Sequence, residues 1–202
     1  MTMFAPLLSA AVIAAAPATP LPWFNMDDYP MKAFEKEWRG ASVFEVLVAP
    51  DGKPADCTIT KSSGYQELDR HTCFIAMHRA RFTPARGPDG SPVYGAYRSV
   101  VMWHRPDQER LQGEPGPDLE VTVSALPNGA KEPPAVKVAY FVDPAGNPSI
   151  CTPLPDSKVQ PKALLDAACS QLFGKLQHAP VTANGAAVPA VKTAAVLFTV
   201  DK

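Results

Sequence analysis

The chain has 202 residues, a formal net charge of −1 at pH 7, 46% hydrophobic residues and 19% charged residues. This composition is typical of a folded globular protein, and the balanced charge gives no electrostatic reason to expect binding to nucleic acid or to an anionic membrane surface. The 23 prolines are about twice the usual share of roughly 5%. Because they cluster between apolar runs, they indicate loops and linkers.

The first residues predict a cleaved signal peptide over residues 1–18. Phe4–Ala16 is an apolar run without charge, and Ala16-Pro17-Ala18 is similar to a cleavage site built of small residues. The run is too short to cross a bilayer, which needs roughly 20 residues. A buried N-terminal helix is the alternative. The signal peptide implies secretion, with no membrane span left after cleavage.

The first half of the remaining chain predicts a short helix, two strands, a longer helix and a third strand. Alternating apolar residues mark the strands, and an apolar stripe at helical spacing marks the longer helix. A turn at Pro50-Asp51-Gly52 separates the first two strands. In chain order, the five elements are Met31–Trp38, Ser42–Ala49, Asp56–Lys61, Glu67–Arg81 and Tyr97–His104.

The second half repeats strand, strand, helix and strand, with one extra strand in front. The elements are Leu119–Ser124, Val136–Val142, Ser149–Leu154, Pro161–Leu176 and Thr193–Val200. The predicted fold class is therefore α+β, with two tandem units that each pack a helix on a small antiparallel sheet. We expect a first domain at 27–105, a Pro/Gly-bearing linker at 106–117 and a second domain at 118–202.

A duplicated motif carries all four cysteines. Val46–Cys57 reads VLVAPDGKPADC and Tyr140–Cys151 reads YFVDPAGNPSIC. A second cysteine follows each motif, Cys73 after 73−57 = 16 residues and Cys169 after 169−151 = 18 residues. In each unit, one cysteine lies on the inward face of a strand and the other on the apolar stripe of the helix.

This placement favours two structural disulfides, Cys57 with Cys73 and Cys151 with Cys169. Closing such a loop stabilises by roughly 3 kcal/mol, a large share of what a small domain can supply. Pairing between the units and four buried free thiols are the alternatives. The closely spaced pairs typical of zinc sites and the C-x-x-C of redox sites are both missing, so we expect no metal and no cofactor.

An ordered set of motifs in the first unit resembles the C-terminal domain of TonB-type energy transducers. The set covers roughly Asp27–Arg105, and the cysteine positions resemble a disulfide-bearing branch of that family. The second unit resembles a degenerate copy that lacks the opening motif and has His178 where the first unit has Phe82. In order, the motifs are Tyr29-Pro30, Ala33, Gly40, Val43, Asp51-Gly52, Ser62-Ser63-Gly64, Leu68-Asp69, Arg81-Phe82-Thr83-Pro84-Ala85 and Gly90-Ser91-Pro92-Val93.

The resemblance implies a periplasmic domain that binds a short peptide of outer-membrane receptors as an added strand at a sheet edge. Carried over, the candidate edge is Ser99, Val100, Val101 and Met102, with weaker equivalents at Ala195–Phe198. Alternatively, those edges pair with each other or with the linker. The chain has neither the anchor nor the long spacer of a full transducer, which argues against force transmission. The oligomeric state is not indicated.

Other functional classes find little support. No catalytic or phosphate-binding motif is present, so we do not expect an enzyme. His71 and His78 look like part of a solvated helix face, and Asp27-Asp28 looks like a cap or turn. A cluster of aromatic residues either packs the short helix or lines a ligand groove: Trp23, Phe24, Tyr29, Phe34 and Trp38. The alternative function is a stand-alone structural or regulatory envelope protein that keeps the fold without transducer activity.

Overall fold

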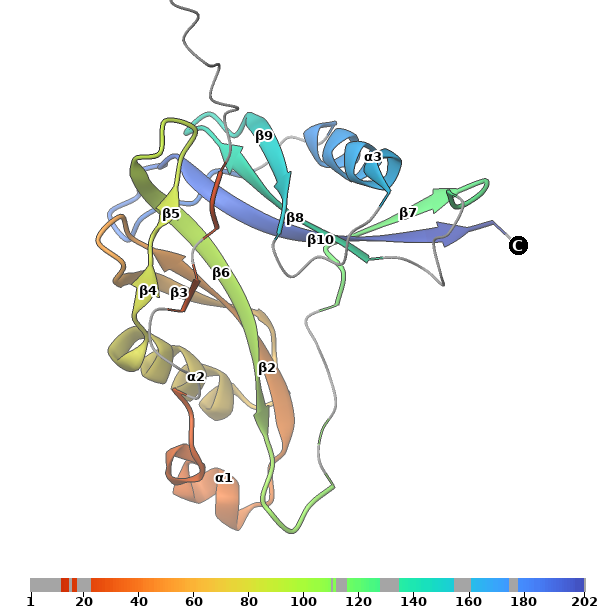
Figure 1. Ribbon diagram of the computed structural model, residues 1–202. Helices are drawn as coiled ribbons and strands as arrows, with labels where there is room; N and C mark the ends of the chain where they lie inside the picture. The colour runs from red at the N-terminus through yellow and green to blue at the C-terminus, as the bar shows by residue number, and fades with distance from the viewer. Residues whose placement is uncertain are drawn as a thin grey trace, which may run out of the picture.

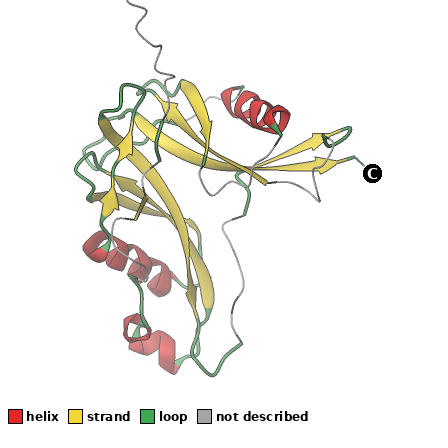
Figure 2. Cartoon of the chain, in the orientation of Figure 1, coloured by secondary structure: helices red, strands yellow, loops and turns green. Residues whose placement is uncertain are grey.

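A computed structural model describes residues 12–14, 16–17, 23–109, 111, 116–127, 135–154, 161–174 and 178–201. It has an α+β fold in which eight strands form one mixed sheet (Figures 1 and 2). The elements of the first unit are β1 (Ala16–Pro17), the 3₁₀ turn η1 (Met26–Asp28), α1 (Met31–Glu35), β2 (Gly40–Val48), β3 (Pro54–Lys61), α2 (Gln66–Arg79), β4 (Phe82–Thr83), β5 (Ala85–Arg86) and β6 (Pro92–Trp103).

The second unit repeats the predicted order of strand, strand, helix and strand. Its elements are β7 (Leu119–Val123), β8 (Ala135–Val142), β9 (Pro148–Pro153), α3 (Lys162–Phe173) and β10 (Ala190–Val200). Along the sheet the strands run β3-β2-β6-β10-β8-β9, so each unit contributes a three-stranded antiparallel set. The units join where β6 and β10 pair in parallel at Tyr94–Gly95 and Ala190–Val191.

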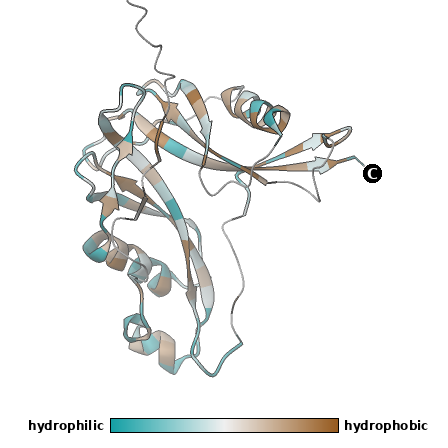
Figure 3. Ribbon diagram, viewed as in Figure 1, coloured by the Kyte–Doolittle hydropathy of each residue, from teal (hydrophilic) through white to brown (hydrophobic). Residues whose placement is uncertain are grey.

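Each helix covers one face of its own three strands, and alternation along the strands explains why. In β2, Phe44, Val46 and Val48 point toward α2 and are almost completely buried. In β8, the alternate residues form a second core beneath α3: Val136, Val138, Tyr140 and Val142. Figure 3 shows hydrophobic and hydrophilic stretches mixed along β6 and β10, as strands with two different faces require.

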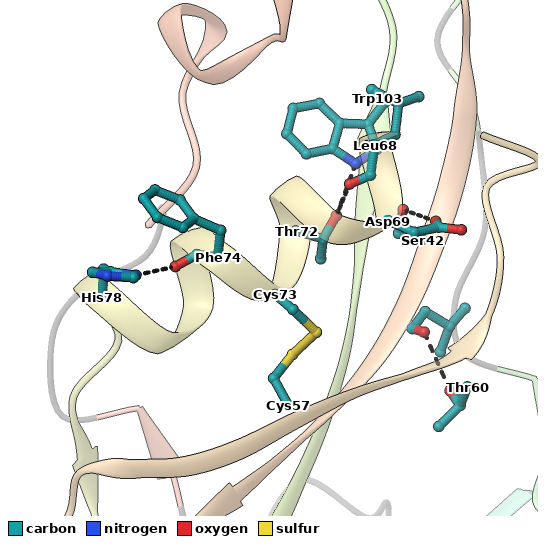
Figure 4. The surroundings of a disulfide bond; sticks show 11 residues. Ser42, Cys57, Thr60, Leu68, Asp69, Thr72, Cys73, Phe74, His78 and Trp103 are labelled. Carbon is teal, nitrogen blue, oxygen red and sulfur yellow. Dashed lines mark hydrogen bonds between the residues drawn. A yellow bond between two sulfur atoms is a disulfide. The ribbon is translucent and has the colours of Figure 1, made fainter. Parts of the chain in front are cut away.

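Both expected cysteine pairs are present, so the pairing within units is confirmed. Cys57 on β3 is bonded to Cys73 on α2, with Cα atoms 5.5 Å apart. Cys151 on β9 is bonded to Cys169 on α3, with Cα atoms 5.9 Å apart. Each disulfide therefore fixes the helix of its unit to the outer strand of the sheet that the helix covers (Figure 4).

The structure also shows short elements that the sequence did not predict. β4 and β5 lie between the predicted helix Glu67–Arg81 and the predicted strand Tyr97–His104, and α1 ends at Glu35, earlier than the predicted end at Trp38. Part of the predicted signal peptide is described: Ile13 bridges to Arg86, and Ala16–Pro17 pair with Phe82–Thr83. The rest of residues 1–18 lies outside the described residues. No helix in the described part of the chain is long and apolar enough to cross a membrane.

Candidate functional site

The four predicted site residues lie on β6, at an edge that is only partly paired. On one side, Gly95–Trp103 pairs with β2 along its whole length. On the other side, β10 pairs with Tyr94 and Gly95 and then diverges. Among the described residues, no strand pairs with Ala96–Trp103 on that second side. The expected edge, Ser99–Met102, therefore lies in the middle of an unpaired stretch.

A shallow pocket of about 240 Å³ opens beside this stretch. Its lining consists of the predicted edge and three aromatic residues: Ser99, Val100, Val101, Met102, Trp23, Phe24 and Phe44. Phe24 packs edge-on against Phe44, with ring centroids 6.1 Å apart. Trp23 and Phe24, two of the aromatic residues for which the sequence left packing and ligand binding open, pack with the core and also line the pocket.

An ion pair between Arg79 and Asp28 holds Trp23, one of the aromatic residues that line the pocket. Arg79, at the end of α2, binds both carboxylate oxygens of Asp28 at 2.8 Å and donates a further hydrogen bond to the backbone oxygen of Trp23. Burial alone would raise the pKa of Asp28, but hydrogen bonds from Arg79 and from the Asn25 amide outweigh it, and the pKa is lowered. Asp28 is therefore a cap and an anchor, as the sequence indicated.

A second buried carboxylate ties α2 to the sheet. Asp69 accepts a hydrogen bond from the Ser42 hydroxyl at 2.7 Å (Figure 4). It also accepts hydrogen bonds from the Ser62 hydroxyl at 2.5 Å and the Ser63 amide at 2.9 Å. Burial acts to raise the pKa of Asp69, but these hydrogen bonds stabilise the charged form more strongly, so its pKa is lowered. We call Asp69 with these three serines the Asp69 hub.

An ion pair lies at the point where β10 diverges from β6. Arg98 of β6 forms an ion pair with Asp118, which precedes β7. Asp118 also accepts a hydrogen bond from the Ala195 amide at 2.8 Å and donates its own amide to the Ala195 oxygen. The guanidinium of Arg98 thus lies between the diverging strands β6 and β10. The part of the β6 edge beyond this contact that is open to a peptide is Ser99–Trp103.

The weaker equivalents in the second unit do not form an open edge. Val196 and Leu197 pair with β8 on one side and with β7 on the other, and Phe198 pairs with Val121. Ala195 pairs with Lys137 and is bound by Asp118. The expectation at Ala195–Phe198 is therefore wrong, because the extra strand before the second unit lies against β10.

The sequence was then compared with known proteins. Residues 26–103 match the family model described as the Gram-negative bacterial TonB protein C-terminal. This stretch of the chain is similar to the TonB C-terminal domain. No curated protein and no solved structure matches the chain significantly.

The motifs of the TonB C-terminal domain meet in space. A Cβ atom on Gly40 would lie 2.1 Å from the Ser63 oxygen, so only glycine lets β2 begin beside the Asp69 hub. Gly52, at φ +82°, accepts a hydrogen bond from the Phe82 amide. These contacts show that motifs far apart in the sequence pack against each other in the fold.

In residues 26–103, His71 and His78 lie on α2, and Asp28 and Asp69 accept the hydrogen bonds described above. His78 accompanies Phe74 on the outer side of α2, facing away from the disulfide (Figure 4). Within the described ranges, no group of three or more His, Cys, Asp or Glu side chains is placed to hold a metal ion. The sequence did not indicate the Arg98–Asp118 contact or the place where β6 and β10 join, at Tyr94–Gly95 and Ala190–Val191.

Proposed function

We propose that the chain is a periplasmic protein–protein interaction module that binds an extended peptide by strand addition to β6. The observation that supports this is the unpaired stretch Ala96–Trp103 with its aromatic pocket at Ser99–Met102. The peptide belongs to an outer-membrane receptor or to another envelope protein. The proposal agrees with the family of residues 26–103, which is a family of protein-interaction domains.

In strand addition, the peptide backbone supplies affinity and the peptide side chains supply specificity. The backbone N–H and C=O groups of the β6 edge supply hydrogen bonds that any extended peptide can make. Since alternate side chains of an added strand face the same side, every second peptide residue lies on the side of Trp23, Phe24 and Phe44. We therefore expect a peptide with a large apolar residue at the position that enters the pocket.

Three features support a periplasmic location. Each of the two small units contains one disulfide, and disulfides persist in oxidising compartments. The apolar N-terminal run fits a signal peptide that ends at residue 18. The matched family comes from Gram-negative bacteria. We also propose that residues 118–202 are a second, degenerate copy of the domain, joined by the linker at 106–117.

Two proline variants test the binding edge. In an antiparallel pair, neighbouring residues alternate in whether their N–H points toward the partner strand. Of Val100→Pro and Val101→Pro, one therefore breaks a hydrogen bond to β2, and the other removes a donor only from the open edge. Thermal unfolding identifies the variant that keeps the stability of the wild type. Calorimetry with synthetic receptor peptides should then show at least a tenfold loss of affinity for that variant.

A matched control is Thr58→Val on β3, which is exposed and distant from the pocket in strand order. It should leave the affinity unchanged. Equal affinity for wild type and for the stable proline variant would contradict binding at β6. It would favour the alternative, a structural or regulatory envelope protein. The closing of the β10 edge by β7 supports that alternative, because it shows that this chain can fill an edge from within.

A further inference from the structure

A second edge in this protein carries an extended segment, and the segment comes from the chain's own N-terminus. Ile13 and Arg86 exchange two backbone hydrogen bonds, of 3.1 and 2.9 Å. Ala16 and Pro17 continue the pairing, antiparallel to Thr83 and Phe82. Residues 13 and 16–17 thus pair, as an added segment, with residues of β4 and β5 (Figure 1). This edge is distinct from the open stretch of β6.

The segment also reaches the second unit. The backbone oxygen of Val12 accepts a hydrogen bond from the Thr152 hydroxyl of β9 at 3.2 Å. The Val12 side chain is only 5% exposed and belongs to the core cluster that Phe141, Ile150 and Leu154 also touch. Ile13, next to it, is 57% exposed. We call the place between Phe82–Arg86 and β9 the seam; it offers backbone groups on one side and an apolar contact for alternate residues.

The backbone of β9 is distorted at the seam. Ile150 has φ +44°, a left-handed conformation that a β-branched residue rarely adopts. It is the extra residue of a bulge, since Tyr140 pairs with Cys151 and Phe141 pairs with Ser149. The bulge turns Ile150 away from the core beneath α3 and toward the cluster that contains Val12. Strain of this kind is often kept where a strand serves recognition.

We propose that the seam is a second strand-addition site, which takes an extended partner segment of small and β-branched residues. Residues 12–17 show how such a segment sits: one residue is buried, the next is exposed, and the backbone pairs with Arg86. Cleavage after Ala18 removes residues 12–17 and leaves the Arg86 amide and oxygen without those partners. The processed protein then binds a partner segment of similar chemistry at the vacated edge.

The test uses protein purified from the periplasm, with its N-terminus determined by mass spectrometry. We expect it to begin after Ala18. A synthetic peptide of residues 9–18 is the probe, and backbone NMR shifts locate it on the protein. Binding should protect the amide of Arg86 from hydrogen exchange and should leave Ser99–Met102 unchanged.

Two matched peptide variants distinguish backbone pairing from nonspecific hydrophobic binding. Ile13→Pro removes the N–H that binds the Arg86 oxygen, so affinity should fall at least tenfold. Ile13→Ala keeps that N–H and trims an exposed side chain, so affinity should stay within about threefold. On the protein, Thr152→Val should weaken binding about threefold, whereas Thr122→Val on exposed β7 should not.

Three results would overturn the proposal. The first is a purified protein that keeps residues 12–17, because the seam is then filled. The second is equal binding of the proline and alanine peptides. The third is a probe that shifts the β6 residues in place of Arg86. That last result would leave the proposed function of β6 intact, so failure of one site is distinguishable from failure of the other.

Discussion

The two units have the same order of elements, but their third strands, β6 and β10, differ in how they are paired. In the first unit, β6 is unpaired on one side from Ala96 onward among the described residues. In the second unit, the equivalent side of β10 is paired with β7 from Val196 to Val200. A strand of the chain itself thus does for β10 what a peptide partner would do for β6. In the second unit, a short segment of alternating residues in front of β8 closes this edge.

The units also differ in how their helices are fixed. Asp69 precedes Cys73 by four residues and anchors α2, while Leu165 stands four residues before Cys169 and packs against an apolar core. Phe82 is buried in the first unit, while His178 is exposed. The first unit keeps polar anchors around its motifs, and the second relies on apolar packing and its disulfide.

The largest expected effect comes from the disulfides. The loops they close are similar, at 16 and 18 residues, so removing either pair by Cys→Ala substitution should cost about 3 kcal/mol. All three tryptophans lie in the first unit, so fluorescence follows that unit during urea unfolding while circular dichroism follows both. If β6–β10 pairing couples the units, loss of Cys151–Cys169 will also move the fluorescence transition. An unmoved fluorescence transition would show that they unfold independently.

Removal of the Asp69 hub should come next. Asp69→Ala leaves the Ser42 hydroxyl and the Ser63 amide without their acceptor, which should cost about 2 kcal/mol. Asp166→Ala is the matched control, because Asp166 forms an exposed ion pair with Lys162 on α3. That change should stay within about 0.5 kcal/mol. Urea unfolding measures both, and equal losses would contradict the contrast between the units.

Gly40 provides a steric test of the same region. A Cβ atom at Gly40 would overlap the Ser63 backbone oxygen, so Gly40→Ala should cost about 1–3 kcal/mol. Gly116→Ala is the control, because nothing lies within 4 Å of the added atom and the site is exposed. Thermal unfolding should separate the two variants clearly. A neutral Gly40→Ala would mean that β2 can move away from the serine turn.

How much of this was predictable from the sequence depends on the range of each interaction. Periodicity located the strands and helices, and the cysteine spacing gave both disulfides, because those signals are local. The four edge residues followed from the family motif alone. The pairing of β6 with β10 involves two residues from each strand and leaves no sequence pattern. The pairing of β7 with β10 does not follow from the sequence, because Leu119–Ser124 is predicted as an extra strand to which no partner strand is assigned.

Acid should weaken the first unit more than the second. The pKa values of Asp28 and Asp69 are lowered in the folded protein, so both carboxylates contribute stability that is complete above their unfolded pKa of about 4. As the pH falls through the lowered folded pKa values, that contribution is lost. Fluorescence-detected unfolding should therefore become easier as the pH falls below about 4. Asp69→Asn should flatten this dependence; an unchanged slope would contradict the role of the hub.

The smallest expected effect on stability tests the comparison of edges directly. Val121→Pro on β7 interrupts the pairing with β10 at Phe198, at the border of the sheet where side chains are half exposed. Stability should fall by about 1 kcal/mol, but the β10 edge should become available. A peptide of residues 117–125 added in trans should then bind the variant and not the wild type, as measured by calorimetry. The exposed Thr122→Val serves as the control, since it keeps every backbone donor. If the variant binds no such peptide, β7 does more than occupy an edge, and the likeness between β7 and a β6 partner fails.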